Sequence, residues 1–396
     1  MREFPIEPTR PRRDHGLLGS QPTAVSRALP AIDYRWETAL LVLGWAVVVL
    51  LAAGQANAVT LGLDTQPGWN IYAGGGYRYG PSIIINPENS IDVWTSAPPA
   101  NSIGWDSIRH MRSTDGGVTW GAETVALQPT PGSYDAYSTC DPGVVYFGGY
   151  YYIGYTSTQN AGGVDNEVCV ARSTSPNSGF QKWNGAGWGG NPQPFIQFTG
   201  TSDQWGAGEP SFVVKDDTLY IYYSWVEGAR TTRVATASVN DANWPAHLTY
   251  HGTAANNGLD DSIDVKYVDA YGKFIGVSVG DRFSSNSYLH VWESQDGLTF
   301  TSSAEVRANT QDWAHNAGIS GTPNGHLDIN DNNVVAYAYC PNDAMTWANW
   351  PTYLNPVTIT CAPEPSVLGM LCGAAAASIA AAMLGRRRNK NGETTE

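Results

Sequence analysis

The chain has 396 residues, and its 36 Asp and Glu outnumber its 22 Lys and Arg, which gives a formal net charge of −14. Such an acidic surface argues against nucleic acid and anionic lipid as partners, and it is easier to reconcile with a neutral sugar polymer. A chain of this length can bury a large core, so a disulfide framework is not required. Four of the five cysteines could still pair in an oxidising compartment, with a pairing that the sequence does not give: Cys140, Cys169, Cys340 and Cys361.

Near the N-terminus, residues 39–58 form an uncharged apolar run, ALLVLGWAVVVLLAAGQANA. The run ends in an A-x-A-like cleavage site at Ala56 and Ala58, with arginines upstream. This order is typical of an export signal, so we expect residues 1–58 to be an N-terminal extension and signal peptide. An uncleaved membrane anchor is the alternative interpretation.

The middle of the chain, from residue 75 to 355, has a hydrophobic period of two. Stretches such as SIIINPENSIDVWTS, VVYFGGYYYIGYTS and SFVVKDDTLYIYYSW each have the pattern strand, turn, strand. No amphipathic helix of ordinary length interrupts them. The pattern predicts an all-β domain.

Five of these hairpins begin with related sequences, which we call the blade entrances: GPS at Gly80, DPG at Asp141, EPS at Glu209, DSIDV around Asp264 and HNAGIS at Asn316. The intervals between them are 61, 68, 55 and 52 residues, close to what one four-stranded blade needs. Self-similarity at this period predicts a five-bladed β-propeller over residues 59–362. A β-sandwich would also alternate, but it would not repeat this four-part order.

The stretch RSTDGGVTW, residues 112–120, reads as a tight turn between strands. Its Ser, Asp, Gly, Thr and Trp follow the pattern S-x-D-x-G-x-T-W, which resembles the Asp-box of sialidases and related propellers. SQDGLTF, residues 294–300, resembles a copy shortened by one residue. The resemblance implies a structural turn between the third and fourth strands of a blade, away from the active site, so Asp115 is not expected to be catalytic.

The C-terminal end reads APEPSVLGMLCGAAAASIAAAMLGRRRNKNG, in which a Pro-Glu-Pro triplet precedes an apolar run and three arginines. That order predicts a transmembrane helix with the arginines on the cytoplasmic side. The segment resembles the PEP-CTERM sorting signal of bacteria that make extracellular polysaccharide, whose motif is matched by Pro363, Glu364, Pro365 and Ser366. The resemblance implies that residues 363–396 are a sorting and anchor segment, that an exosortase-type peptidase processes it, and that the protein is exported to the cell envelope or extracellular matrix.

The first strand of each blade in a propeller lines the central funnel, so carboxylates at the entrances are expected to converge there. Asp141, Glu209 and Asp264 are three such residues. Glycoside cleavage needs one protonated carboxyl group that donates to the leaving oxygen and one ionised group that activates water or attacks carbon. Each of these carboxylates could instead start a strand and accept backbone N–H groups.

CDPGVVYFGGYYYIGYTST and GEPSFVVKDDTLYIYYSW resemble the blade entrances of five-bladed furanosidase and xylosidase propellers, the family 43 glycoside hydrolases and their relatives. The resemblance implies that Glu209 is the proton donor and that Asp141 is a modulator or base. It also implies an Asp base in the first blade, where this chain has Gly80 instead.

The carboxylate missing from the first blade has several candidate replacements. Asp92, Asp106 and Asp135 lie near blade entrances or loops, and Asp135 is preferred because the loop GSYDAYST runs directly into Asp141. Asp264 could serve instead if the site has shifted around the ring.

Aromatic and polar residues supply candidate binding groups. Trp188 and Trp205 lie in Gly-rich loops, where flat rings can stack on sugar faces. His315 resembles the last-blade histidine that holds a central ion or its waters in some of these hydrolases. No cofactor is required, although the oxygen-rich DINDNN, residues 328–333, suggests either a structural calcium or a solvated turn.

The leading hypothesis is an exported glycoside hydrolase-like propeller that cleaves a poly- or oligosaccharide. The alternative is a propeller that binds glycan at the cell surface or matrix without cleaving it. A sialidase-like enzyme is the third hypothesis, with Arg78 as the first of three arginines that clamp a carboxylate; Arg230 and Arg282 lie in or near loops.

Overall fold

The computed structural model describes residues 57–64, 68–72, 74–99, 103–340 and 350–363. The predicted signal segment lies outside these ranges up to residue 56, and the predicted anchor lies outside them from residue 364. Within the described ranges, no helix is long and apolar enough to span a membrane.

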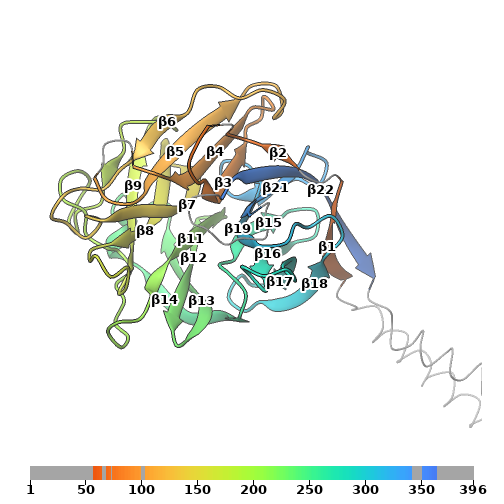
Figure 1. The fold of residues 1–396 in the computed structure, drawn as a ribbon. Helices are drawn as coiled ribbons and strands as arrows, with labels where there is room; N and C mark the ends of the chain where they lie inside the picture. Colours follow the sequence, from red (N-terminus) through yellow and green to blue (C-terminus); the bar gives the residue numbers. More distant parts are fainter. Residues whose placement is uncertain (1–56, 65–67, 73, 100–102, 341–349, 364–396) are drawn as a thin grey trace, which may run out of the picture. The chain divides into compact units, whose positions relative to one another are not determined.

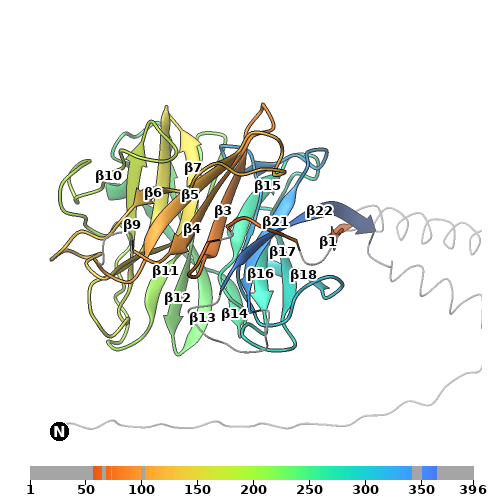
Figure 2. The ribbon, with the colours of Figure 1, turned by 45° about the horizontal axis from the view of Figure 1, so that its top comes forward.

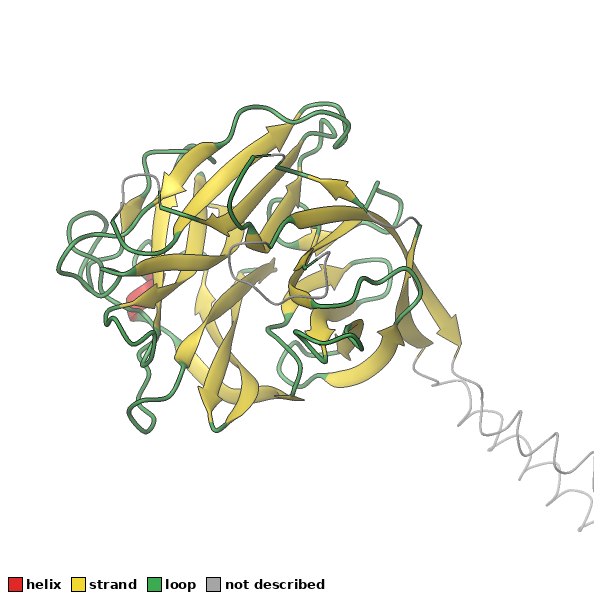
Figure 3. Ribbon diagram, in the orientation of Figure 1, coloured by secondary structure: helices red, strands yellow, loops and turns green. Residues whose placement is uncertain are grey.

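The described chain folds into five β-sheets, which confirms the predicted all-β propeller of five blades (Figures 1 and 3). Blade one contains β3 (Tyr79–Ile85), β4 (Ile91–Ala97), β5 (Ser107–Ser113) and β6 (Thr124–Leu127). Blade two contains β7 (Ser138–Phe147), β8 (Tyr150–Thr158), β9 (Glu167–Ser173) and β10 (Gln181–Lys182). Blade three contains β11 (Gly206–Lys215), β12 (Thr218–Glu227), β13 (Ala229–Ser238) and β14 (Thr249–Gly258), with the short 3₁₀ helix η1 (Trp244–Ala246) before β14.

Blades four and five carry additional short strands. Blade four contains β15 (Asp264–Val268), β16 (Lys273–Gly280), β17 (Tyr288–Ser294) and β18 (Thr301–Val306), and β20 (His326–Leu327) pairs in parallel with β15. Blade five contains β19 (Ala314–Ile319), β21 (Val334–Tyr339), β22 (Thr352–Pro363) and β1 (Asn57–Leu63), and β2 (Trp69–Asn70) also pairs with β22.

The five predicted entrances all lie at or next to the first strand of a blade. These strands contact one another in a closed ring, in the order β3, β7, β11, β15, β19 and back to β3 (Figures 1 and 2). Alternating hydrophobic sequence produces this arrangement, because successive side chains of each strand point to opposite faces and pack on the two neighbouring blades.

The ring is closed by an N-terminal strand that the sequence does not predict. β1 pairs antiparallel with β22, from Asn57 opposite Pro363 to Leu63 opposite Val357. The outermost strand of blade five therefore comes from the start of the described chain, whereas the other blades take all four main strands from one continuous stretch.

The hydrophobic core is divided among the five blade interfaces. One buried apolar cluster lies between each pair of neighbouring blades, with representative residues Trp94, Trp244, Phe274, Tyr337 and Ile91. Apolar burial of this kind holds the blades side by side.

The turn around Asp115 connects β5 to β6, the third and fourth strands of blade one. Its carboxylate accepts hydrogen bonds from the backbone N–H of Thr119 at 2.8 Å and from the Thr119 hydroxyl at 2.6 Å. These bonds, with one from Ser113, lower the pKa of Asp115 to about 2. Asp296 accepts similar backbone bonds between β17 and β18 of blade four. Both carboxylates stabilise turns by accepting hydrogen bonds, and neither lines the central pockets described below.

Candidate functional site

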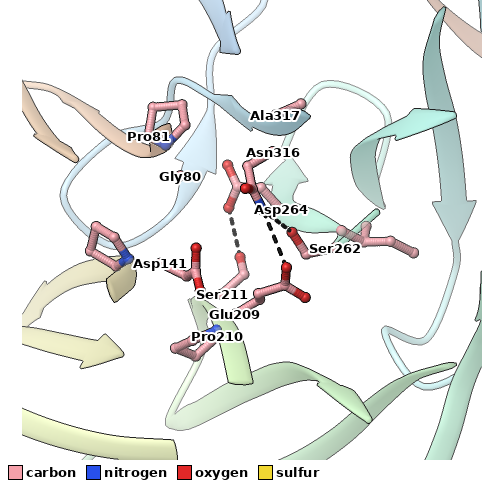
Figure 4. Close-up of a pocket in the computed structure, with 12 residues that line it drawn as sticks. Gly80, Pro81, Asp141, Glu209, Pro210, Ser211, Ser262, Asp264, Asn316 and Ala317 are labelled. Carbon is pink, nitrogen blue, oxygen red and sulfur yellow. Dashed lines mark hydrogen bonds between the residues drawn. The ribbon is translucent and has the colours of Figure 1, made fainter. Parts of the chain in front are cut away.

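The centre of the ring is built from one repeated backbone feature. In four blades the first strand carries a bulge, at which the residue with positive φ is Gly80 (59°), Asp141 (49°), Glu209 (49°) or Asn316 (41°). A positive φ strains any residue except glycine and is kept where the surrounding structure requires it, often at functional sites. Figure 4 shows Asp141, Glu209 and Asn316 around one central pocket.

Glu209 lies in blade three and is held by two charged or polar neighbours. Arg230, at the start of β13, pairs with Glu209 Oε2, and the Asn316 amide donates to Oε1 at 3.2 Å (Figure 4). The Glu209 and Arg230 side chains are both buried. Burial alone would lower the pKa of Arg230, but Glu209 and Asp261 raise it, so this guanidinium remains charged against the carboxylate.

Asp141 lies on the neighbouring blade in a different environment. Burial raises the pKa of Asp141 to about 8, and the negative charge of Glu209 adds to the rise. Among the described residues, no cation pairs with the Asp141 carboxyl group. The backbone N–H of Asp141 donates to Ser96 Oγ at 2.7 Å, and the Cys140 thiol lies 3.3 Å from Asp141 Oδ2. Both causes of the raised pKa favour the protonated form of this carboxyl group, beside an ion-paired Glu209.

A third acid, Asp261, contacts several of the residues that form the site. It is fully buried and pairs with Arg282 at 2.9 Å and with His315 Nδ1 at 2.8 Å, and it lies 3.6 Å from Arg230. Burial alone would raise the pKa of Asp261, but Arg282, His315 and Arg230 lower it well below the usual value. Its second oxygen also accepts the backbone N–H of Asn316 at 3.0 Å, so Asp261 fixes both the cations and the neighbouring bulge.

Above the bulges lies a cavity of about 450 Å³, which we call the funnel cavity. Its acidic residues are Asp106, Asp141 and Glu209, and Arg282 and His315 also line it. The aromatic side chains in its wall are Tyr77, Tyr79, Trp105, Trp205 and Phe283. This combination of rings and a few polar groups suits a ligand such as a sugar, which has both apolar faces and hydroxyl groups.

Asp106 is the candidate for the missing carboxylate that reaches this cavity. Its Oδ1 accepts the Tyr77 hydroxyl at 2.5 Å, and its Oδ2 accepts the Ser138 hydroxyl at 2.7 Å. Burial raises the pKa of Asp106 despite these hydrogen bonds. The sequence-based preference for Asp135 over Asp106 does not match the geometry.

Asp135 is placed elsewhere, as a buried residue outside the funnel. Its Oδ2 pairs with Lys182 at 2.5 Å and accepts the Tyr155 hydroxyl at 2.9 Å, and its Oδ1 accepts the backbone N–H of Thr130. Asp92 is similarly occupied by Arg112 and His110 within blade one. Neither carboxylate lines the central pocket or the funnel cavity.

Asp264, the first residue of β15, lines the central pocket together with Asp141 and Glu209, so the three predicted entrance carboxylates do converge there. Ser262 and Ile263 line the same pocket from blade four, but none of these three blade-four residues lines the funnel cavity. Asp264 Oδ1 accepts Ser211 at 2.7 Å and Lys266 at 2.6 Å, and its Oδ2 accepts the backbone N–H of Ile319 at 2.8 Å (Figure 4). These bonds tie blades three, four and five together below the funnel cavity.

The predicted binding residues fall into two groups. Trp205 lines the funnel cavity, with the Arg230 guanidinium 5.4 Å from its ring centroid. Trp188 packs instead against Trp183 and Tyr152 in blade two, away from the cavity. Arg78 is buried in an ion pair with Glu123 at 2.7 Å and does not line the cavity, so it cannot begin an arginine clamp there.

His315 lies in the cavity wall among aromatic rings, and its Nδ1 faces Asp261. Among the described residues, no group of three or more His, Cys, Asp or Glu side chains is arranged to hold a metal ion. In the DINDNN turn, Asp328 accepts the backbone N–H and the side-chain amide of Asn330, each at 2.9 Å. The structural calcium remains a prediction.

Sequence reasoning missed Asp261 and the role of Arg230. Aligning SID at residues 262–264 with GPS and EPS would have placed Ser262 at the entrance and Asp261 beside it. Nothing in the sequence around Arg230 shows that its side chain reaches Glu209, 21 residues earlier.

No protein-family model matches the sequence, and no curated protein matches it. Several solved structures resemble the fold. Zg3597, a family 117 glycoside hydrolase from the marine bacterium Zobellia galactanivorans, has a TM-score of 0.54 at 15% identity, covering 78% of this chain and 93% of that one. An endo-arabinase from Bacteroides thetaiotaomicron has a TM-score of 0.51 at 15% identity, covering 74% and 98%. A thermostable family 43 glycoside hydrolase has a TM-score of 0.50 at 13% identity, covering 74% and 91%. At such identities the similarity shows the five-bladed fold.

Proposed function

We propose that the funnel cavity binds a poly- or oligosaccharide and hydrolyses a glycosidic bond, with Asp141 as proton donor and Glu209 as the ionised carboxylate. The observation that carries this proposal is the contrast between two neighbouring carboxyl groups. Asp141 has a pKa of about 8, while Glu209 is paired with Arg230. Glycoside hydrolysis needs this combination of one protonated and one ionised group.

In this mechanism the Asp141 carboxyl group gives its proton to the glycosidic oxygen as the bond to the anomeric carbon breaks. Glu209 accepts a proton from the water that attacks that carbon. Arg230 and Asn316 hold Glu209 in place, and each carboxylate oxygen retains a second lone pair for the water. The assignment exchanges the roles that the family 43 resemblance implies, because the structure pairs Glu209, rather than Asp141, with an arginine.

The remaining cavity residues are proposed to position the sugar. Trp205, Trp105 and Tyr79 offer rings for a sugar face, and Asp106 with Tyr77 offers hydrogen bonds to hydroxyl groups. The solved structures with this fold include an endo-arabinase and an endo-1,4-beta-xylanase, which makes arabinans and xylans suitable first substrates.

The test is reducing-end release by the full-length protein on arabinans, xylans and envelope polysaccharides, with polymer binding measured in parallel. Release that Asp141→Asn and Glu209→Gln both abolish supports the proposal. Binding without release on every polymer would rule out hydrolysis of these substrates.

A second candidate function is glycan binding without cleavage. It is favoured by Gly80, which leaves the bulge of the first blade without a carboxylate, and by the hydrogen bonds that occupy both oxygens of Glu209. Binding-only behaviour in the same assay would select this function.

Export is a separate proposal that rests on the sequences at the two ends of the chain. We propose a mature protein in the cell envelope or extracellular matrix, processed by an exosortase-type peptidase and anchored in the membrane before processing. Cell fractionation followed by mass spectrometry of both termini tests this location; a cytoplasmic protein with both terminal segments intact would contradict it.

A further inference from the structure

A second groove of about 440 Å³ lies on blade three, and we call it the blade-three groove. Its floor and walls come from the loop at 194–199, from Tyr223 and Trp225 of β12, from Arg233 of β13, and from Tyr250 and Gly252 of β14. It shares no lining residue with the funnel cavity, so the two are distinct sites.

The groove is rich in aromatic rings. Phe195, Tyr223 and Trp225 line it as largely buried rings, and Tyr223 lies two residues from Trp225 on the same face of β12. Tyr250 is 58% exposed, although its hydroxyl reaches the backbone oxygen of Phe195 at 3.4 Å. An exposed ring beside a recess offers a flat apolar surface to the face of a sugar.

Arg233 places a positive charge in this groove without an acidic partner. Its guanidinium lies 3.6 Å from the centroid of Trp225, and it sits opposite Tyr223 in the β12–β13 ladder. Within the described part of the chain, no carboxylate lies within 4.0 Å of it, and its buried Nε has no hydrogen-bond partner. The nearby Glu227 accepts hydrogen bonds from Thr201 and from the Trp225 indole; it forms no ion pair with Arg233, and its charge acts on the guanidinium only from beyond that distance.

Most of the other described arginines of this acidic protein form ion pairs, unlike Arg233. Six described arginines form ion pairs: Arg78, Arg109, Arg112, Arg230, Arg282 and Arg307. Arg172 is stacked as Arg233 is, with its guanidinium 4.4 Å from the centroids of Tyr150 and Trp188, but it does not line the groove. Arg233 therefore combines an unpaired charge with a recess large enough for a ligand.

We infer that the blade-three groove binds an acidic sugar unit of a polysaccharide chain, with the sugar ring against the aromatic wall and its carboxylate or sulfate on Arg233. A guanidinium that stacks on an aromatic ring keeps its N–H donors in a plane that matches an oxyanion. The net charge of −14 favours a neutral polymer for the molecule as a whole, but recognition in the groove is decided by the local charge. The site would hold a charged polymer independently of cleavage in the funnel cavity.

The test compares polygalacturonate with the same polymer after full methyl esterification, which removes the charge and keeps the chain. We expect the full-length protein to bind polygalacturonate more tightly, with an affinity that falls as salt concentration rises. Arg233→Gln should weaken this binding by about tenfold or more, since it removes charge-assisted hydrogen bonds to the anion. The inference would be overturned if polygalacturonate and its methyl ester bind equally and if dextran sulfate binds no more tightly than dextran.

Two further variants keep the test decisive. Arg172→Gln removes the other stacked, unpaired arginine and should leave the affinity unchanged. Tyr250→Ala removes an exposed ring, which rarely affects folding, and should weaken binding even if Arg233→Gln is unstable. Dextran sulfate against dextran distinguishes a sulfate from a carboxylate as the preferred anion. Wild-type affinity in both Arg233→Gln and Tyr250→Ala would contradict the proposal.

Failure of this inference can be separated from failure of the proposed hydrolysis. Glu209→Gln removes the ionised carboxylate of the funnel cavity and leaves the groove residues in place. It should therefore retain the dependence of polygalacturonate binding on Arg233, whether or not the wild type releases reducing ends.

Discussion

Blades two and three differ from blade one at the same backbone position. All three have a bulge with positive φ in the first strand, but the residue there is Asp141 in blade two, Glu209 in blade three and Gly80 in blade one. The bulge is therefore a feature of the ring, and the chemistry depends on which side chain it carries. Placing acids on two adjacent bulges creates the contrast in protonation that the proposed mechanism uses.

The largest expected effect comes from removing the ionised member of this pair. Glu209→Gln should reduce hydrolysis by roughly 10²- to 10⁴-fold, because an amide cannot accept a proton from the attacking water. The measurement is kcat on the best polymer from the panel. Glu305→Gln, at an exposed ion pair with Arg307, is the control and should retain full activity. Unchanged turnover in Glu209→Gln would remove this residue from the mechanism.

Removing the buried acid Asp261 should mainly lower the free energy of unfolding. Asp261→Asn deprives Arg282 and the buried Arg230 of a buried counter-charge, and breaking a buried ion pair in this way costs about 3–5 kcal/mol. Urea unfolding measures the change. Asp241→Asn, at an exposed contact with His247, should change the free energy of unfolding by about 0.5 kcal/mol or less. Similar values for the two variants would show that Asp261 does not organise the site.

Adding a carboxylate to blade one tests the difference between the blades directly. A Cβ at Gly80 would lie 3.1 Å from Asp141 Oδ1 and 3.4 Å from Ser96 Oγ, so Gly80→Asp should destabilise the protein by about 1–3 kcal/mol. The added charge should also raise the pKa of Asp141 further and lower hydrolysis at neutral pH. Gly80→Ala separates crowding from charge. If Gly80→Asp increases hydrolysis, a first-blade base was missing, and our assignment of Glu209 is wrong.

The last expected effect is a gradual one, on the pH dependence of stability. Because the pKa of Asp141 is raised to about 8, the folded protein binds one more proton than the unfolded chain between about pH 4 and pH 8, and stability falls as pH rises through that window. Asp141→Asn removes this dependence, so its Tm should exceed that of the wild type increasingly toward pH 8, by about 2–4 °C for each kcal/mol. Thermal melts from pH 4 to pH 9 provide the measurement. Parallel pH curves for the two proteins would contradict the raised pKa.

The sequence predicted the blades well because the entrance motifs repeat at each bulge. Gly80, Asp141, Glu209 and Asn316 all lie where the interval of one blade placed them, and the turns at Asp115 and Asp296 connect third to fourth strands. These features are local, since each depends on a few consecutive residues.

The candidate site was less predictable because its partners are far apart in the sequence. The polar loop around Asp135 predicts a catalytic carboxylate, but Lys182, which lies 47 residues away in the sequence, forms an ion pair with it. Asp264 reaches the central pocket as predicted, but its oxygens are occupied by Ser211 and Ile319, which lie 53 and 55 residues away. The ion pair between Glu209 and Arg230 joins β11 to β13 across the intervening strand β12, so it depends on the pairing of three strands.

The pairing of β1 with β22 has a consequence for biosynthesis. The ribosome makes β1 first and β22 last, so β1 has no partner until almost the entire propeller has been translated. At typical elongation rates of about 5–20 residues per second, this wait lasts roughly 15–60 s. During that time Val59, Leu61 and Leu63, which are buried in the finished ring, belong to an unpaired apolar strand of the kind that other chains can capture. Correct folding therefore requires that β1 remains unpaired until β22 has been synthesised.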